Sequence, residues 1–338
     1  MRKLLVAEVA ALLVLLVVAV GVRLSAGQSP SQPSLNSQPS ESQSTEATQV
    51  LGPGFSEPTE ATAPAQTEPT WATLPAGLEL KAQQYFVYDI TAQEYLACSG
   101  TPQDQVYPAS ITKLFTAYVA MQYVDPQKEI TAGDVLDLVA WGSSVAKIKK
   151  GDTLTAGQLV EAMLLPSGND AAYMLACEAG RVMKGNPNLS PSAAVQAFMT
   201  QMNAQAKAVG MTNTHFVNPD GIHDSQHYTT FADLAILGKL SMENETIMKH
   251  AITPNKDVQL HGETITWKNT NALVNPTTEY YCPYAVGLKT GQTPSAGSCL
   301  LSAFRKGDTE LIIGVFGCPE EEDRFDDTLQ LFNQIVLK

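Results

Sequence analysis

The sequence lacks a basic segment of the kind that binds nucleic acids. Its 338 residues include 21 Lys and Arg against 34 Asp and Glu, which gives a formal net charge of -13 at pH 7. Phosphate backbones are bound by faces rich in Lys and Arg, so this balance argues against a nucleic-acid partner. The acidic excess is typical of a surface that keeps a protein in solution.

Cysteine and histidine are few, and neither occurs at the spacing of a metal site. The five cysteines contain no CxxC pair and the five histidines show no HExxH motif, so we expect no metal ion and no cofactor. An odd count leaves at least one thiol outside any intrachain bridge. Cys282 and Cys299 are one possible pair, but five separate buried thiols are the favoured interpretation. The remaining cysteines are Cys98, Cys177 and Cys318.

What the chain does contain falls into three zones of different composition. Residues 1–26 begin with two basic residues and continue as a long apolar run that is broken early by Glu8. This run fits either a membrane anchor or a cleaved signal peptide, and we favour the anchor, with its positive end in the cytoplasm. Residues 27–76 are rich in Ser, Thr, Pro, Gln and Glu and predict a disordered linker. Residues 77–338 carry one continuous globular pattern.

Hydrophobic periodicity in the third zone predicts strands at both ends and helices between them. Strands are expected at 84–90, 95–98, 284–288, 298–304 and 311–316, with the last two paired as a hairpin. Helices are expected at 111–124, at 156–165 behind Thr155, from Pro191 to Gly210, behind Thr230 and at about 323–336. This order predicts one antiparallel sheet with helices packed on it.

The first candidate motif is Ser110-Ile-Thr-Lys113, which follows Pro108 in the first turn of a predicted helix. Residues three apart share a helix face, so the Lys113 amine can reach the Ser110 hydroxyl. A hydroxyl needs a base before it becomes a nucleophile, and a lysine is a base only when its pKa is lowered. Taken alone, the same pattern fits a helix cap followed by a surface lysine.

The second candidate motif is Ser167-Gly-Asn169, which lies between two predicted helices. Pro166 and Gly168 break the first helix, and this places a hydroxyl and an amide on a tight loop. The hydroxyl can relay a proton to a leaving amine, and the amide can hold a substrate carbonyl. Alone, the motif is better explained as an ordinary capped turn, because Ser and Asn are favoured there.

The third candidate motif is Lys289-Thr-Gly291, which follows a strand-like run, so we expect Lys289 and Thr290 at a strand end. A lysine beside a hydroxyl suits a substrate carboxylate, and Gly291 lets the backbone approach a substrate closely. Together with the first two motifs, and in this order, it forms the triple of penicillin-binding proteins and class A β-lactamases, which have Ser-Asp-Asn in the middle.

Beyond these motifs, the sequence resembles the low-molecular-weight penicillin-binding proteins, the serine-type D-alanyl-D-alanine carboxypeptidases of peptidase family S11. The resemblance covers about 80–338 and rests on Ser-Gly-Asn-Asp at 167–170 and on four further stretches: GMTNTHFVNPDGI (210–222), HYTT (227–230), WKNTNAL (267–273) and GLKTGQTPSAG (287–297). It implies a β-lactamase/D,D-peptidase-like α/β fold, in which an antiparallel sheet flanked by helices carries a mostly helical subdomain. The resemblance also implies that residues 77–338 form the catalytic domain.

The resemblance implies a catalytic role for three side chains. Ser110 would attack the carbonyl of the penultimate D-Ala of a peptidoglycan stem pentapeptide. Lys113 would accept the Ser110 proton, and Ser167 would pass a proton to the departing D-Ala. Water would then hydrolyse the acyl-enzyme, and β-lactam antibiotics would acylate Ser110 because they mimic D-Ala-D-Ala.

Five further residues would bind the substrate if the resemblance holds. Lys289 and Thr290 would hold its terminal carboxylate, and Asn169 would bind its backbone. The backbone amides of Gln292 and Ser110 would form the oxyanion hole. Gly291, between Thr290 and Gln292, would let the backbone approach the substrate. The enzyme would act outside the cytoplasm, in the cell envelope, either anchored through its N-terminal segment or released after cleavage.

Several alternatives remain open. A D,D-endopeptidase that cuts cross-links would use the same chemistry, and an inactive wall-binding homologue would keep the fold without it. A β-lactamase is disfavoured, because no glutamate stands in a recognisable deacylation motif between 167 and 289. His227 raises the possibility of a Ser-His-Asp site, but the chain has no Gly-x-Ser-x-Gly elbow, so we interpret His227 as structural.

The sequence also departs from the family. Many relatives continue into a β-rich second domain and a C-terminal amphipathic anchor, whereas this sequence ends at Lys338. We expect the N-terminal segment and the linker to take over the anchoring role.

Overall fold

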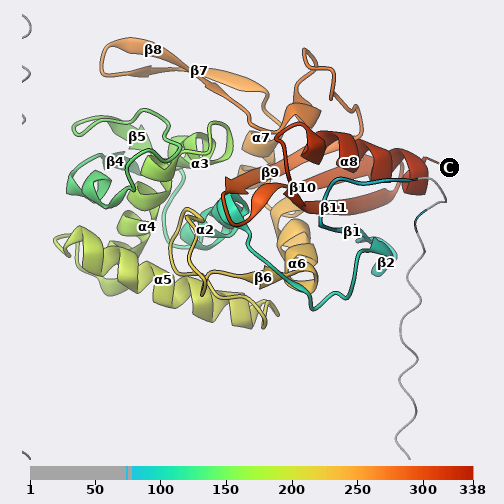
Figure 1. Ribbon diagram of the computed structural model, residues 1–338. Coiled ribbons are helices and arrows are strands. Elements are labelled where there is room, and N and C mark those ends of the chain that lie inside the picture. The colour runs from blue at the N-terminus through green and yellow to red at the C-terminus, as the bar shows by residue number, and fades with distance from the viewer. Residues whose placement is uncertain (1–73, 75–77, 338) are drawn as a thin grey trace, which may run out of the picture. The chain divides into compact units, whose positions relative to one another are not determined.

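Five antiparallel strands form the central sheet, in the order β2-β1-β11-β10-β9 (Figure 1). The computed structural model describes residue 74 and residues 78–337, so the predicted anchor and, apart from Leu74, the predicted linker lie outside the described residues. The strands are β1 (Gln84–Asp89), β2 (Glu94–Cys98), β9 (Ala285–Thr293), β10 (Gly297–Lys306) and β11 (Thr309–Cys318). The predicted antiparallel sheet is confirmed, and β1 and β11 pair directly although they are far apart in sequence.

Both faces of this sheet are buried, because neighbouring residues of each strand enter two different cores. Phe86 on β1 and Ile312 on β11 belong to one core, whereas Val87 and Ile313 belong to the other. Side chains alternate between the two faces of a strand, so such strands need an apolar layer on each side. Figure 1 shows α6 against one face and α8 against the other.

A mostly helical lobe lies beside the sheet, as predicted, and is inserted between β3 and the C-terminal strands (Figure 1). The helices are α2 (Thr112–Ala120), α3 (Ala156–Leu164), α4 (Asn169–Lys184), α5 (Pro191–Ala208), α6 (Phe231–Met242), α7 (Glu245–Ala251) and α8 (Asp323–Leu331). Shorter turns are η1 (Ala109–Ile111), η2 (Asp134–Leu138), η3 (Ala272–Val274) and the π-helical η4 (Phe332–Val336). Three small strand pairs complete the fold: β3 (Gln105–Val106) with β6 (Thr229–Thr230), β4 (Glu129–Thr131) with β5 (Thr153–Thr155), and β7 (Asn255–Leu260) with β8 (Glu263–Lys268).

The predicted helix starts follow from local capping. The Thr155 side chain accepts a hydrogen bond from the Gln158 amide, and the Gln158 side chain returns one to the Thr155 amide, which completes a capping box. Thr230 caps α6 by accepting from the Asp233 amide. No capping box forms at this start, because the Asp233 carboxylate binds the Asn213 amide and the Thr214 hydroxyl instead, at 2.9 and 2.6 Å.

Two expectations about the C-terminal third were incomplete. The strand expected at 284–288 does not stop before Lys289, because β9 continues to Thr293 and pairs Gly291 with Cys299. Lys289 therefore lies inside a strand and not at its end. The β7–β8 hairpin was not predicted at all.

No cysteine forms a disulfide: all five are free, and four of them are buried. The possible bridge between Cys282 and Cys299 is therefore absent. In the part of the chain that the structure describes, no helix is both long and apolar enough to cross a bilayer.

The β7–β8 hairpin stabilises a loop that matters for the site. The Trp267 indole on β8 is buried and donates a hydrogen bond to the Ala146 carbonyl at 2.9 Å. His261 at the hairpin turn contacts Asp152 at 3.1 Å. These contacts hold the 139–152 segment, which contains Ser144, against the β7–β8 hairpin.

Replacing Trp267 with Phe should loosen this loop without unfolding the domain. Phe keeps most of the apolar area but leaves the buried Ala146 carbonyl without its donor, which costs about 1–3 kcal/mol. We expect a lower urea midpoint and faster amide hydrogen exchange concentrated in 139–152. Unchanged exchange in that segment would contradict the proposed link. Tyr281→Phe, at an exposed position, is the control.

Candidate active site

A cleft of about 560 Å³ opens where the helical lobe meets β9, the edge strand of the sheet. All three sequence motifs contribute to its wall. The lining residues are Ser110, Ser144, Ser167, Thr270, Thr290, Gly291, Gln292, Thr293, Pro294, Gly297, Ser298, Pro319, Glu321 and Arg324. Lys113, Asn169 and Lys289 do not line the cleft but lie buried beside lining residues.

Ser110 lies in the tight turn η1, which leads into α2. Ala109 in this turn has a positive φ of 47°, which is unusual for a residue with a side chain. A Cβ on Gly291 would lie 2.9 Å from the Pro108 carbonyl, and a Cβ on Gly221 would lie 1.8 Å from the Ala109 carbonyl. The turn is therefore enclosed by two chain segments that can approach it only because both are glycine. The predicted approach of Gly291 to a substrate remains a prediction.

Lys113 is fully buried, and its Nζ donates to the Ser110 hydroxyl at 2.8 Å and to the Asp220 carbonyl at 2.7 Å. Burial lowers the pKa of Lys113 to about 8, although Asp220 and Asp170 oppose the shift. A lysine with that pKa is neutral in about a tenth of molecules at pH 7, against fewer than one in a thousand for a free lysine. The arrangement can therefore remove a proton from Ser110.

His227 stabilises the loop that supplies the Asp220 carbonyl. It is buried, and it contacts the Thr112 hydroxyl through Nε2 at 2.8 Å while its Nδ1 accepts from the Val217 amide at 3.1 Å. An acceptor at Nδ1 places the proton of the neutral ring on Nε2. Burial lowers the pKa of His227 to about 4. No hydrogen bond joins His227 to Ser110 among the described residues, and this is in line with its interpretation as structural.

Ser167 reaches the cleft because of an unusual backbone turn. Its φ is 63°, and the next residue must be glycine, since a Cβ on Gly168 would lie 2.7 Å from the Asp170 carboxylate and 2.8 Å from the Ala162 carbonyl. Asn169 then begins α4 and is 3% exposed. Its Oδ1 accepts no hydrogen bond from the described residues. The presence of glycine in the middle of this motif thus has a steric cause.

Asp170 is a positioning residue that sequence reasoning missed. Its buried carboxylate accepts from the amides of Ala146 and Ile148 at 2.9 and 3.0 Å, and the Asn169 amide donates to the Ser144 carbonyl at 2.8 Å. These bonds fix the 139–152 segment beside the Ser167 turn, so Ser144 lines the cleft. Its position directly after Asn169 was the available signal.

Lys289 and Thr290 meet Thr270 at the opposite wall. Lys289 is fully buried, and its Nζ donates to the Thr270 hydroxyl and the Thr290 carbonyl, both at 3.1 Å. Thr290 also donates to Thr270 at 2.6 Å. No carboxylate pairs with Lys289 among the described residues, and burial, aided by Lys113 and Arg324, holds its pKa well below the usual value. An incoming carboxylate would therefore meet an uncompensated lysine.

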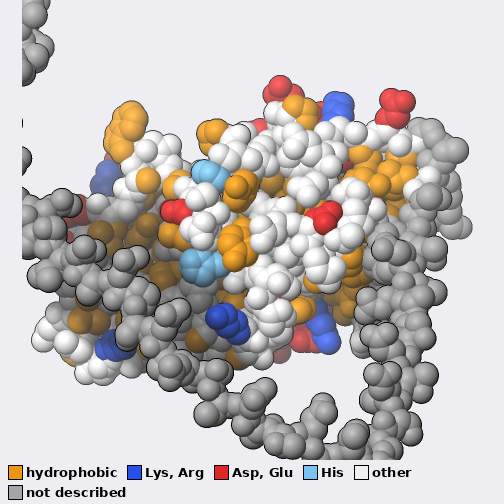
Figure 2. All heavy atoms as spheres, turned by 60° about the horizontal axis from the view of Figure 1, so that its bottom comes forward, with side chains coloured by type: hydrophobic (Ala, Val, Ile, Leu, Met, Phe, Trp, Pro, Cys, Tyr) orange, Lys and Arg blue, Asp and Glu red, His pale blue; other side chains and the backbone are white. Residues whose placement is uncertain are grey.

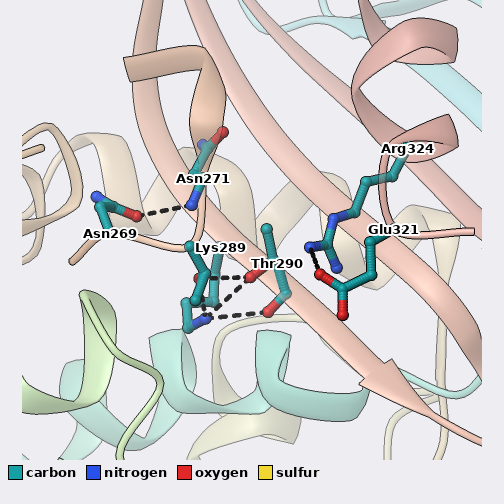
Figure 3. Close-up of polar contacts among 7 residues, drawn as sticks. Asn269, Asn271, Lys289, Thr290, Glu321 and Arg324 are labelled. Atoms are coloured by element: carbon teal, nitrogen blue, oxygen red, sulfur yellow. Dashed lines mark hydrogen bonds and ion pairs between the residues drawn. The ribbon is translucent and has the colours of Figure 1, made fainter. Parts of the chain in front are cut away.

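Asn269 and Asn271, the two neighbours of Thr270 in sequence, are joined by a hydrogen bond (Figure 3). Asn269 donates to the carbonyls of Ala251 and Thr253, and its Oδ1 accepts from the Asn271 amide at 2.9 Å. Asn271 in turn donates to the Gly287 carbonyl on β9 at 3.2 Å. The WKNTNAL stretch thus joins the loop before η3 to the strand that carries Lys289.

Arg324, in the first turn of α8, is a second cation that the sequence analysis missed. It lines the cleft, its side chain is only 6% exposed, and its guanidinium pairs with Glu321 at 3.3 Å (Figure 3). Its Nε and the buried Ser298 hydroxyl, which also lines the cleft, have no partner among the described residues. No local motif marks this arginine, because only the packing of α8 on the sheet brings it to the cleft.

The pKa of His227 predicts a pH dependence of stability. Between pH 4 and 6.5 the unfolded chain binds a proton at this histidine and the folded protein does not, so stability falls as the pH falls through that window. His227→Gln keeps a donor and an acceptor but cannot titrate. Wild type should lose roughly 3 kcal/mol relative to His227→Gln between pH 6.5 and 4, measured by urea unfolding. Parallel stability curves would mean that the folded protein protonates His227 readily.

Comparison with known proteins agrees with this architecture. A family model for D-alanyl-D-alanine carboxypeptidases, peptidase family S11, matches residues 68–320. The D-alanyl-D-alanine carboxypeptidase of Streptomyces sp. strain K15 is 32% identical over 234 residues, which cover 66% of this chain and 77% of that protein. D-alanyl-D-alanine carboxypeptidase DacF of Bacillus subtilis is 28% identical over 225 residues, which cover 65% of this chain but only 54% of DacF. The chain thus spans about half the length of DacF.

Solved structures show the same fold. The Streptomyces K15 DD-transpeptidase superposes with a TM-score of 0.69 at 28% identity, over 79% of this chain and 100% of that one. Penicillin-binding protein D2 from Listeria monocytogenes, in its cefotaxime-bound form, gives a TM-score of 0.62 at 25% identity, over 77% of this chain and 98% of that one. From the family match over residues 68–320, the chain belongs to the D-alanyl-D-alanine carboxypeptidases of peptidase family S11.

Proposed function

We propose that this protein is a serine D,D-carboxypeptidase that removes the terminal D-Ala from peptidoglycan stem peptides through an acyl-enzyme on Ser110. The observation that carries the proposal is the 2.8 Å hydrogen bond between a buried Lys113, with its lowered pKa, and the Ser110 hydroxyl at the floor of the cleft. Family membership and the names of the relatives support the same activity.

Acylation would start at Ser110. Its Oγ attacks the carbonyl carbon of the penultimate D-Ala while Lys113 takes the hydroxyl proton. The negative charge moves to the carbonyl oxygen, where the backbone amides of Ser110 and Gln292 would donate hydrogen bonds to it. Both residues line the cleft, and the close approach of Gly291 to the Ser110 turn keeps β9 beside the nucleophile.

Expulsion of D-Ala needs a proton on the leaving nitrogen. The proton that Lys113 has taken can return through the Ser167 hydroxyl, which lines the same cleft, as the C–N bond breaks. The side-chain amide oxygen of Asn169 has no partner among the described residues, so Asn169 would bind the peptide backbone of the substrate. A water molecule then attacks the ester, Lys113 again takes the proton, and Ser110 is regenerated.

Substrate choice would rest on the carboxylate at the peptide end. Lys289 and Thr290 would bind it from β9, and Thr270 orients both. Arg324 adds a second cation at the same wall, and a free carboxylate can replace Glu321 as its partner. A carboxylate that pairs with these buried cations would also raise the lowered pKa of Lys289.

The same acyl-enzyme permits other acceptors. The K15 relative is a DD-transpeptidase by name, and a D,D-endopeptidase would differ only in the group expelled. Water as the acceptor is favoured by the carboxypeptidase names of the sequence relatives.

Because D-Ala-D-Ala ends belong to the cell wall, we further propose that the enzyme works outside the cytoplasm. We also propose that β-lactams inhibit it, as the cefotaxime-bound relative binds one. Membrane attachment through 1–26 remains part of the proposal.

Ser110→Ala should abolish both covalent penicillin labelling and D-Ala release. The purified protein would be incubated with a fluorescent penicillin, the adduct mapped by mass spectrometry, and D-Ala release followed from a stem pentapeptide. We expect labelling of Ser110 and release at least about a thousandfold above Ser110→Ala, since the nucleophile is lost. Ser192→Ala, an exposed serine on α5, is the matched control.

The outcomes separate the alternatives. Labelling without D-Ala release, but with cleavage of cross-linked dimers, would favour the endopeptidase, and transfer to an added amino acid would favour the transpeptidase. A folded protein that takes up no label would contradict the enzymatic proposal and leave the wall-binding homologue.

Arg324→Gln should weaken recognition of the substrate carboxylate while leaving the nucleophile intact. We expect kcat/KM for a free-carboxylate peptide to fall about 10- to 100-fold, in line with the loss of one charge-assisted hydrogen bond. The amidated peptide should change little between wild type and variant. Arg305→Gln, at an exposed arginine on β10, is the control. Equal losses on both peptides would show that Arg324 acts on the fold and not on the carboxylate.

A further inference from the structure

One buried acidic side chain beside Lys113 has no role in the steps above. Asp220 is 1% exposed, and its backbone carbonyl accepts from the Lys113 Nζ at 2.7 Å. Its carboxylate accepts only a weak hydrogen bond at Oδ1, from the Ile222 amide at 3.3 Å, and Oδ2 has no partner among the described residues. A carboxyl group without partners in a protein interior is costly, so its retention calls for a cause.

Hydrogen bonding at Oδ2 favours neither protonation state of Asp220 among the described residues. The ionised form lacks donors at Oδ2, and the protonated form would have no acceptor for its hydrogen there. The state of this carboxyl group therefore depends on the charges that face it. Burial raises the pKa of Asp220, and Lys113, the strongest of the facing charges, opposes that shift.

Asp170, the other acidic group that acts on Lys113, is bound differently. Its carboxylate accepts from three backbone amides, those of Ala146, Ile148 and Ala171, at 2.9 to 3.0 Å. Those donors already stabilise its charge. Of the two acids, Asp220 is thus the one whose carboxylate has only a weak hydrogen-bond donor to stabilise its charge.

We propose that Asp220 sets the basicity of Lys113, because its carboxylate supplies the countercharge when Lys113 takes the Ser110 proton. The proposal rests on the role of Lys113 proposed above and adds a tuning residue to it. Burial alone would make Lys113 a weak base, since the ammonium is expensive in the interior. A nearby carboxylate, beyond direct ion-pair contact, restores part of that basicity.

The loop geometry fixes Asp220 for this role. Gly221 has a φ of 85° and passes so close to Ala109 that any Cβ would collide with its carbonyl. Thr116 on α2 donates to the Pro219 carbonyl at 2.7 Å. The backbone at Asp220 is therefore held between the Ser110 turn and α2, and its carbonyl keeps a constant position relative to Lys113.

Titratable groups on the neighbouring elements also face Lys113 and Asp220. Asp170 on α4 acts on Lys113, and Tyr173 on the same helix faces Asp220. Lys289 on β9 and His227 before β6 both sense the charge of Lys113. His227 stays neutral above pH 4, so it does not titrate with Lys113.

The test is the pH dependence of acylation by a β-lactam, measured by stopped flow on the full chain between pH 5.5 and 10. Removing the carboxylate charge with Asp220→Asn keeps the carbonyl that binds Lys113. The midpoint of the acidic limb should move down by about 1 pH unit, because removing a nearby opposite charge lowers the pKa of a lysine. The plateau at high pH should fall, since Lys113 becomes a weaker base.

Two further variants make the result interpretable. Asp220→Ser removes the same charge with a smaller side chain and should shift the limb in the same direction. Asp224→Asn, the same substitution four residues along the loop, should leave the midpoint in place. Thermal unfolding identifies any variant that does not fold.

The outcomes distinguish this inference from the proposed function. If wild type is not acylated, the proposed function fails. If wild type is acylated and the folded Asp220 variants keep its midpoint, Asp220 is neutral or purely structural, and the inference is overturned. A shift to higher pH would also overturn it, because loss of a carboxylate cannot strengthen the base.

Discussion

The hydrogen bond between the buried Lys113 amine and the Ser110 hydroxyl is the constraint on which the rest of the site depends. Lys113 can be a base only if its charge is disfavoured, and the protein achieves this by removing the amine from water. Burying an amine requires acceptors that are themselves held in place. The Asp220 carbonyl is such an acceptor, and much of the surrounding architecture fixes its position.

The segments around Ser110 explain why this packing is possible. Gly221 and Gly291 approach η1 from two sides, at distances that exclude any Cβ. His227 and Thr116 connect α2 to the loop that carries Asp220. The Ser110 turn is thus held by packing and hydrogen bonds from two segments that are distant in sequence, and this pre-organises the proposed nucleophile before any substrate arrives.

In the proposed mechanism the two buried lysines have different roles. Lys113 has acceptors at the nucleophile and a carboxylate nearby, so it is suited to exchanging a proton. Lys289 has only hydroxyl and carbonyl partners among the described residues, and Arg324 adds to the positive charge around it. That wall is therefore suited to receiving a negative charge. The same residue type thus serves two tasks because its neighbours differ.

Features of the fold and the site that depend on local spacing could be predicted from the sequence. Features that depend on tertiary packing could not. A Ser and a Lys three residues apart at a helix start imply a contact, and the structure brings Ser110 and Lys113 together. Strand periodicity correctly indicated the sheet. Arg324 reaches the cleft only because α8 packs on the sheet, and no pattern within α8 indicates it. The extension of β9 past Gly291 was missed because the strand was predicted to end before Lys289, and Gly291 was assigned to contact with a substrate, whereas close packing on the Ser110 turn requires a glycine there.

The ionisation of Lys113 tests the account most directly. Lysine labelled with 13C at Cε reports the charge of each amine by NMR, and the Lys113 signal is assigned by its disappearance in Lys113→Arg. The account predicts a Lys113 signal that titrates with a pKa of about 8, far below the ordinary 10.5. A signal that titrates near 10.5 would mean that Lys113 is a charged structural residue, and the proposed mechanism would have no base.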